Sequence, residues 1–218
     1  MTKYVLFDLD GTLNDPYEGI TSCIKYALKS VGIDENDPVK LRSYIGPPLR
    51  DTFAKYGFDS KKCEELVEKY REKFLVTGIH QNIPYEGVHE MLEKLYEHGC
   101  KIALASCKPE HACRVILEET GMLKYFEVVS GATLDKTLDT KPAIIKLSLD
   151  RLGVKEDELE HVYMVGDRDM DMTGAHENKV IAVGALFGYG GRDELTESGA
   201  DYLIESPLEL VDIVLGKE

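Results

Sequence analysis

The sequence predicts an α/β fold in which a mostly parallel sheet is flanked by helices. A near-continuous apolar run, Tyr4-Val5-Leu6-Phe7, is typical of a strand buried in a parallel sheet. Residues 15–80 then show helical spacing of apolar residues and no convincing strand. From Tyr85 onward, helical and strand patterns alternate, as they do in chains whose sheet has helices on both faces. The expected architecture is therefore a Rossmann-like sheet with a small all-helical domain inserted after the first strand.

The expected domain organisation is a split core that carries one insertion. Residues 1–14 and 81–218 form the α/β core, because the first strand must join the sheet that the later strands build. Residues 15–80 form the helical domain, with hinges at Asn14–Pro16 and Gly78–Pro84. Helices are predicted within the insertion at Tyr17–Val31, Leu41–Ile45, Leu49–Tyr56 and Lys61–Val76.

In the core, helices and strands are expected to follow one another along the chain. The helices are predicted at Val88–His98, Glu110–Thr120, Pro142–Leu152, Met170–Asn178 and Pro207–Leu215. The strands after the first are predicted at Lys101–Ser106, Phe126–Val129, Val162–Val165, Val180–Val183 and Tyr202–Ile204.

Composition and charge limit the classes of partner and location. A formal net charge of -14 argues against nucleic acid and anionic membranes, because both attract basic surfaces. No apolar run approaches the ~20 residues of a membrane span. The five cysteines are odd in number and form no C-x-x-C, which argues against a disulfide framework and a zinc site. Because Met1-Thr2-Lys3 leads straight into a strand without a secretory leader, we expect a cytoplasmic protein.

Two carboxylates follow the first strand. Side chains at i and i+2 of a strand point to the same side, so Asp8 and Asp10 are expected to project together, and Gly11 lets the backbone turn away. Two neighbouring carboxylates repel each other unless a cation, a shared proton or a ligand compensates. An acidic turn without chemistry is the alternative, since Asp and Gly are common turn residues.

Further polar residues follow the later strands. The second strand ends in Ser106-Cys107-Lys108, and the fourth is followed by Gly166-Asp167-Arg168-Asp169-Met170-Asp171. Lys141 stands at the start of the helix before that fourth strand. In open α/β sheets, ligands bind outside the carboxyl ends of the strands, so these groups predict one site for a metal and a phosphate.

Each residue type has a chemical use at such a site. An ionised Asp can attack phosphorus without a helper base. A neighbouring carboxyl that carries a proton can donate it to the leaving oxygen and then take one from the attacking water. Mg²⁺ prefers hard oxygen ligands, and a lysine and a hydroxyl can neutralise charge on the phosphoryl oxygens beside it.

The order of these residues resembles that of a known superfamily. The four motifs of the haloacid dehalogenase superfamily of phosphatases are matched, in order, by Asp8-x-Asp10-Gly11-Thr12, Ser106, Lys141 and Gly166-Asp167-x3-Asp171. The helical insertion after the first motif resembles the C1 cap of that superfamily, so the resemblance covers nearly the whole chain.

The resemblance implies catalytic roles for four residues. Asp8 would be the nucleophile and Asp10 the general acid/base. Ser106 would bind the phosphoryl group, while Lys141 would stabilise it and orient Asp8.

It also implies a magnesium site. Mg²⁺ would be held by Asp8, Asp167 and the backbone carbonyl of Asp10. Thr12 and Asp171 would support this shell.

Within the superfamily, three stretches resemble the phosphoglycolate-phosphatase-like branch, which includes 5'-nucleotidases. They are Ser106-Cys107-Lys108-Pro109, Ile45-Gly46-Pro47-Pro48-Leu49 and Gly166-Asp167-Arg168. The implied activity is Mg²⁺-dependent hydrolysis of a small phosphate monoester. Three alternatives stay open: a 5'-nucleotidase acting on nucleoside monophosphates, a β-phosphoglucomutase-like phosphotransferase, and an inactive or receiver-like signalling module. A receiver lacks a large helical insertion after its first strand, whereas this chain has one.

Three residues are weaker candidates for substrate binding. Arg50, after the Gly-Pro-Pro turn, could reach a substrate anion from the cap, or could be a surface residue. Lys108 could contact phosphate or carry surface charge, and Cys107 is more readily explained as a small buried residue than as a nucleophile. Gly188-Tyr189-Gly190-Gly191 is expected to be a flexible loop near the site. The substrate, the choice between monomer and dimer, and an open or closed cap are left undecided by these motifs.

Overall fold

The computed structural model describes residues 2–133 and 137–216, and the chain divides into two compact units. Unit 1 comprises Met1–Asp15 and Pro84–Glu218, and unit 2 comprises Pro16–Ile83. No helix within the described residues is long and apolar enough to cross a membrane.

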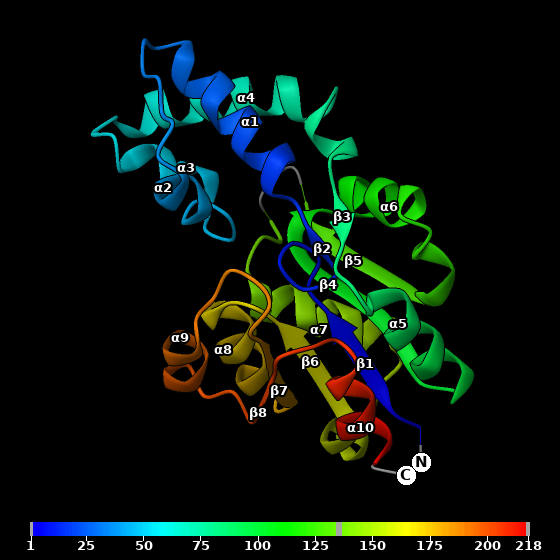
Figure 1. Cartoon of the computed structure of the whole chain (residues 1–218). Helices are drawn as coiled ribbons and strands as arrows, with labels where there is room; N and C mark the ends of the chain where they lie inside the picture. The colour runs from blue at the N-terminus through cyan, green and yellow to red at the C-terminus, as the bar shows by residue number, and fades with distance from the viewer. Residues whose placement is uncertain (1, 134–136, 217–218) are drawn as a thin grey trace. The chain divides into compact units, whose positions relative to one another are not determined.

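Unit 1 is built on a six-stranded sheet with the strand order β5-β4-β1-β6-β7-β8 (Figure 1). Every pair of neighbouring strands in it is parallel. The strands are β1 (Tyr4–Phe7), β4 (Lys101–Pro109), β5 (Val128–Ala132), β6 (Val162–Gly166), β7 (Ile181–Ala185) and β8 (Tyr202–Ile204). Two short strands, β2 (Asn14–Asp15) and β3 (Ile83–Pro84), form a separate two-stranded sheet.

Helices cover both faces of the large sheet, as expected for a parallel sheet whose central strand is wholly buried. The helices of unit 1 are α5 (Val88–Glu97), α6 (Glu110–Glu119), α7 (Lys141–Leu152), α8 (Asp169–Glu177), α9 (Arg192–Glu197) and α10 (Glu209–Leu215). On one face, Tyr4 and Leu6 of β1 belong to a core cluster with residues of α7 and α8. Helices α5 and α10, which contact each other, lie on the opposite face (Figure 1). The predicted α/β fold class is therefore confirmed.

The register of the three central strands brings their carboxyl ends to one edge. Phe7 of β1 lies opposite Leu104 of β4 and Val165 of β6. Asp8 follows Phe7 directly, and its N–H continues the ladder to the Val165 carbonyl at 2.9 Å. The chain places β4 and β5 on one side of β1 and β6, β7 and β8 on the other, so the strand order reverses beside β1. Such a reversal is where open α/β sheets bind ligands.

Unit 2 is helical. It contains α1 (Tyr17–Lys29), α2 (Pro38–Arg42), α3 (Leu49–Ala54), α4 (Ser60–Phe74) and the 3₁₀ helix η1 (Gly78–His80). Helix α1 packs along α4, and α3 packs against α4 as well. Gly19 of α1 permits close approach of η1, because a Cβ there would lie 2.4 Å from the Gly78 carbonyl oxygen.

The expected helix at Leu41–Ile45 was placed too late in the chain, since α2 spans Pro38–Arg42. The cause is local. Asp37 is the N-cap, and its carboxylate accepts from the N–H groups of Val39 and Lys40. Pro38 occupies the first helical position, where its missing N–H costs nothing.

Two strands of unit 1 end three residues later than predicted, and three short helices were not predicted. Strand β4 does not end at Ser106 but continues, with an irregular register, to Pro109. The strand predicted at Phe126–Val129 is Val128–Ala132. Helix α9 (Arg192–Glu197) was not predicted, because six residues are too few to show a helical period. The 3₁₀ helices η2 (Leu123–Tyr125) and η3 (Glu156–His161) were not predicted either.

Candidate active site

Lys141 lies at the centre of the polar residues that follow the strands. Its ammonium group is 2.8 Å from a carboxylate oxygen of Asp8 and 2.8 Å from one of Asp171. It also donates a hydrogen bond of 2.9 Å to the carbonyl oxygen of Ala105 in β4. The side chain is buried and starts α7, so the helix and the sheet together fix its position.

The two carboxylates keep this buried lysine charged. Burial alone would lower the pKa of Lys141, but the charges of Asp171 and Asp8 outweigh it and raise the pKa well above its ordinary value. Burial raises the pKa of Asp171 to about 6 against the opposing charge of Lys141. Lys141 is therefore a fixed positive charge between Asp8 and Asp171.

Asp167 follows β6 and is 0% exposed. One carboxylate oxygen accepts from the Thr12 hydroxyl at 3.3 Å, and the other accepts from the backbone N–H of Tyr189 at 2.8 Å. Burial, and then the neighbouring charges of Asp171 and Asp8, raise the pKa of Asp167 well above its ordinary value. The fold thus holds an acid in surroundings that disfavour its ionised form.

Gly11 makes room for that carboxylate. Its φ of +87° lies in the left-handed region, which side chains rarely adopt. A Cβ on Gly11 would lie 2.2 Å from an oxygen of Asp167, far inside van der Waals contact. Glycine is required here both for the turn after β1 and for the approach of Asp167.

The carboxylates of Asp8, Asp167 and Asp171 fit a divalent cation. Each offers an oxygen, and these oxygens lie within 4.8 Å of one another. Three carboxylates against the single ammonium of Lys141 leave an excess of negative charge in a buried place. Mg²⁺ prefers such hard oxygen ligands and would offset the repulsion. In the described part of the chain, this cluster does not include the side chain of Asp10.

The Asp10 carboxylate pairs with Lys108 instead. The lysine ammonium lies 2.6 Å from one oxygen of Asp10 and 2.8 Å from the other. The Lys108 side chain is 9% exposed, so the alternative of an ordinary surface charge is wrong. Ser106 is buried, and its hydroxyl accepts from the backbone N–H of Lys108 at 3.4 Å. Ser106, Lys108 and Asp10 thus gather beside the carboxylate cluster.

Cys107 and Arg50 are the two remaining candidates from the sequence. Cys107 packs against the core cluster, and burial raises the pKa of its thiol to about 11, which disfavours a thiolate nucleophile. Arg50 belongs to unit 2, where its half-exposed guanidinium pairs with Glu64.

Two residues near the cluster were not predicted as parts of the site. Tyr189 supplies a backbone N–H to Asp167, and only its glycine-rich surroundings pointed to a loop there. Glu194 of α9 accepts from the Arg168 side chain at 2.8 Å and from the Asp169 N–H at 3.1 Å. The Arg168 N–H in turn donates to Asp171 at 3.0 Å, so α9 helps to hold the segment after β6.

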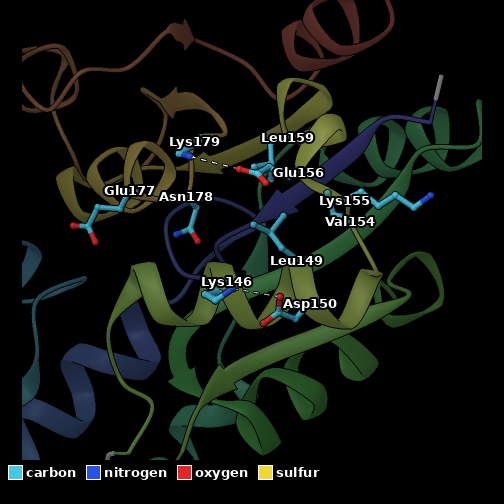
Figure 2. Close-up of a pocket in the computed structure, with 10 residues that line it drawn as sticks. All are labelled: Lys146, Leu149, Asp150, Val154, Lys155, Glu156, Leu159, Glu177, Asn178 and Lys179. Carbon is cyan, nitrogen blue, oxygen red and sulfur yellow. Dashed lines mark ion pairs between the residues drawn. The ribbon is translucent and has the colours of Figure 1, made fainter.

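A surface hollow of about 340 Å³ lies elsewhere on unit 1 (Figure 2). It is formed by α7, η3 and the end of α8, and two exposed ion pairs lie along it, Lys146–Asp150 and Lys179–Glu156. Because η3 leads into β6 and the end of α8 leads into β7, the hollow lies at the amino ends of these strands. Its lining, as far as the structure describes it, includes none of the cluster carboxylates, so it is not the candidate active site.

Known proteins similar to this chain were found by family, by sequence and by structure, and the three comparisons agree with one another. A family model described as haloacid dehalogenase-like hydrolase matches residues 5–185. A 5'-nucleotidase of Pseudomonas aeruginosa is 42% identical over 192 residues, which cover 88% of this chain and 86% of that protein. A phosphoglycolate phosphatase of Aquifex aeolicus is 30% identical over 212 residues, covering 97% and 96%. Among solved structures, a Clostridium difficile protein with a provisional assignment as a phosphatase has a TM-score of 0.88 and 43% identity, covering 98% of both chains.

Proposed function

Because the chain belongs to the haloacid dehalogenase-like hydrolases, as a phosphatase of that family, we propose that it hydrolyses a small phosphate monoester through a phospho-aspartyl intermediate on Asp8. The observation that carries the proposal is the meeting of Asp8, Lys141, Asp167 and Asp171 at one edge of the sheet. The three-carboxylate cluster has no evident structural purpose, since like charges are crowded together in a buried place.

In the first step, a carboxylate oxygen of Asp8 bonds to phosphorus while the bond from phosphorus to the ester oxygen breaks. Lys141, 2.8 Å from Asp8, orients the nucleophile. Asp10 gives its proton to the departing oxygen, which leaves as an alcohol. Ser106 and Lys108 stand beside Asp10 and supply a hydroxyl and a positive charge for the phosphoryl oxygens.

In the second step, Asp10 takes a proton from water, and the resulting oxygen attacks phosphorus. The bond between phosphorus and Asp8 breaks, which releases inorganic phosphate and restores the carboxylate. Asp10 stands two residues after the nucleophile in the chain, and it would serve both steps.

The proposed cofactor is Mg²⁺, bound by Asp8, Asp167 and the backbone carbonyl of Asp10, with Asp171 and Thr12 in support. When bound, it would neutralise charge on the transferring phosphoryl group. Thr12 and the Tyr189 N–H orient the Asp167 carboxylate toward that task.

We assign the helical insertion, expected at 15–80, as a C1-type cap that excludes water and selects the leaving group. Arg50 is its candidate contact for a substrate anion. We also propose a cytoplasmic location, which the five free cysteines support.

Nucleoside 5'-monophosphates are the first substrates to test, because a relative 42% identical is named as a 5'-nucleotidase. Phosphoglycolate comes second on the same reasoning, from a relative 30% identical. The experiment measures phosphate release from a panel of nucleoside monophosphates, phosphoglycolate and hexose phosphates, with Mg²⁺ and with excess chelator.

We expect release from at least one monoester, dependent on divalent metal and lost in Asp8→Asn. Phosphate release by Asp8→Asn at the wild-type rate would overturn the nucleophile assignment. An isomerised hexose phosphate as the main product would replace the hydrolase with a phosphotransferase.

A further inference from the structure

Tyr189, in the loop between β7 and α9, makes hydrogen bonds to two separate segments of unit 1. The backbone N–H of Tyr189 donates to a carboxylate oxygen of Asp167 at 2.8 Å. Its phenol donates to a carboxylate oxygen of Asp15, the last residue of β2. Unit 2 begins at the next residue, Pro16. Tyr189 therefore links Asp167 to Asp15, the last residue of unit 1 before the chain enters unit 2.

The same loop also contacts the segment where the chain re-enters unit 1 after the helical insertion. The ring of Phe187 packs edge-on against the ring of Tyr85, with centroids 5.3 Å apart. Tyr85 follows Pro84, the first residue of unit 1 after the insertion. The N–H of Tyr85 donates to the carbonyl of Leu13 at 3.1 Å, so the two connections are also tied to each other.

Two glycines let this loop lie directly on the cluster. A Cβ on Gly188 would lie 2.3 Å from the Gly11 carbonyl oxygen and 2.4 Å from Cβ of Asp167. A Cβ on Gly190 would lie 1.9 Å from the Asp167 carbonyl oxygen. Since no free space separates the loop from Asp167, a displacement of one requires a displacement of the other.

We propose that Tyr189 is a positioning residue that couples metal binding at Asp167 to the rigidity of the two connections between the units, at Asp15–Pro16 and Ile83–Pro84. The inference rests on the proposed magnesium site. Metal bound at Asp167 holds its carboxylate, and through it the Tyr189 N–H. The phenol then holds Asp15, and Phe187 holds Tyr85. Coupling is reciprocal, so loosening the connection at Asp15 must weaken metal binding by the same factor.

The test uses Tyr189→Phe, which removes the phenol oxygen and keeps both the ring and the backbone N–H. The control is Tyr96→Phe, which removes the same atom from a side chain that is 55% exposed and packs on Tyr125. Mg²⁺ affinity is measured by calorimetry on the intact enzyme without substrate. Amide hydrogen exchange at Asp15 and Tyr85 is followed with and without Mg²⁺.

In the wild type, Mg²⁺ should slow amide exchange at both Asp15 and Tyr85. Tyr189→Phe should raise the Kd for Mg²⁺ about three- to tenfold, the effect of one hydrogen bond, and should abolish the slowing at Asp15. Asp15→Ala, which removes the acceptor of the phenol hydrogen bond, should raise the Kd similarly. The double variant should be no worse than either single variant, because both break one link. Tyr96→Phe should match the wild type.

The outcomes separate this inference from the proposed function. Mg²⁺ binding that Asp167→Asn abolishes supports the metal site whatever Tyr189→Phe does. If the wild type binds Mg²⁺ and Tyr189→Phe binds it equally well, the coupling is refuted and the proposed function stands. If the wild type binds no Mg²⁺, both fall.

Discussion

Asp167 in unit 1 and Glu35 in unit 2 are both carboxylates shielded from water, but their neighbours differ in kind. Asp167 faces the carboxylates of Asp171 and Asp8, and its pKa is raised. Glu35 accepts from the Asp37 N–H at 3.0 Å and from the Tyr56 hydroxyl at 2.8 Å. The Asp37 N–H and the Tyr56 hydroxyl, with the charge of Lys40, lower the pKa of Glu35 against the opposing effect of burial.

Glu35 is surrounded by hydrogen-bond donors that stabilise its charge, whereas Asp167 is surrounded by carboxylates that repel its charge. Glu35 ends a chain of donors, because the Tyr44 hydroxyl donates to Tyr56 at 3.0 Å and Tyr56 donates to Glu35. Such a satisfied group contributes to stability without any ligand. The crowded cluster around Asp167 has the single ammonium of Lys141 for three carboxylates, so a bound cation would have to supply the rest of the compensation, which is the arrangement expected of a functional site.

The largest effect is expected from Asp8→Asn. Loss of the nucleophile should reduce phosphate release by at least about 10³-fold. Stability without metal should stay the same or increase, because one negative charge leaves the cluster while Lys141 keeps Asp171 as a partner. Phosphate assays and thermal unfolding in chelator measure the two effects. A clear loss of stability would show that the Asp8 carboxylate is structural, as Glu35 is.

Lys141→Met removes the buried positive charge and should destabilise the protein by about 3 kcal/mol, because three carboxylates lose their compensation. Lys146→Met is the matched control on the same helix, where the lysine is 69% exposed and pairs with Asp150. Its effect should stay within about 0.5 kcal/mol. Urea unfolding in chelator measures both. Equal stability of the two variants would contradict the role given to Lys141.

Glu35→Gln should destabilise the protein by about 1–2 kcal/mol, since one of the two hydrogen bonds is lost and the other becomes neutral. Because the pKa of Glu35 is lowered on folding, its contribution is fully present above the unfolded pKa of about 4.3. It is lost as the pH falls below that value and through the folded pKa. The difference between variant and wild type should therefore shrink in acid.

The matched control for that experiment is Glu68→Gln, also in unit 2, where the side chain is 65% exposed and pairs with Arg71. It should leave the urea midpoint unchanged at every pH. A pH-independent difference for Glu35→Gln would show that its effect comes from packing and not from charge.

The smallest change in stability is expected from Arg50→Ala. Its pair with Glu64 joins side chains that are 50% and 38% exposed, and such surface pairs contribute under about 1 kcal/mol. Urea unfolding should therefore be nearly unchanged. A raised KM with unchanged stability would identify Arg50 as a substrate contact, and an unchanged KM would leave it as a surface residue.

Much of unit 1 could be predicted because its signals are local. The apolar run at Tyr4–Phe7 shows a buried strand, and polar residues at the carboxyl ends of three strands show which edge carries the chemistry. The i, i+2 rule could not assign the partners of the two carboxylates after β1. Asp8 joins the carboxylate cluster, whereas the side chain of Asp10 pairs with Lys108.

The rest depends on contacts that leave no local pattern. Asp10 and Lys108 are 98 positions apart, so their pairing exists only once β1 and β4 are side by side. Tyr189 serves Asp167 through a backbone N–H, which every residue except proline possesses. Glu194 lies on a six-residue helix that is too short to produce a periodic signal.

The central position of β1 has a consequence for synthesis on the ribosome. The nucleophile follows β1 near the N-terminus, but its neighbours in the sheet are β4, from Lys101, and β6, from Val162. At about 5–20 residues per second, translation delivers β6 roughly ten to thirty seconds after β1. Lys141 is synthesised before β6 and Asp167 directly after it, so catalytic competence must arrive late in synthesis.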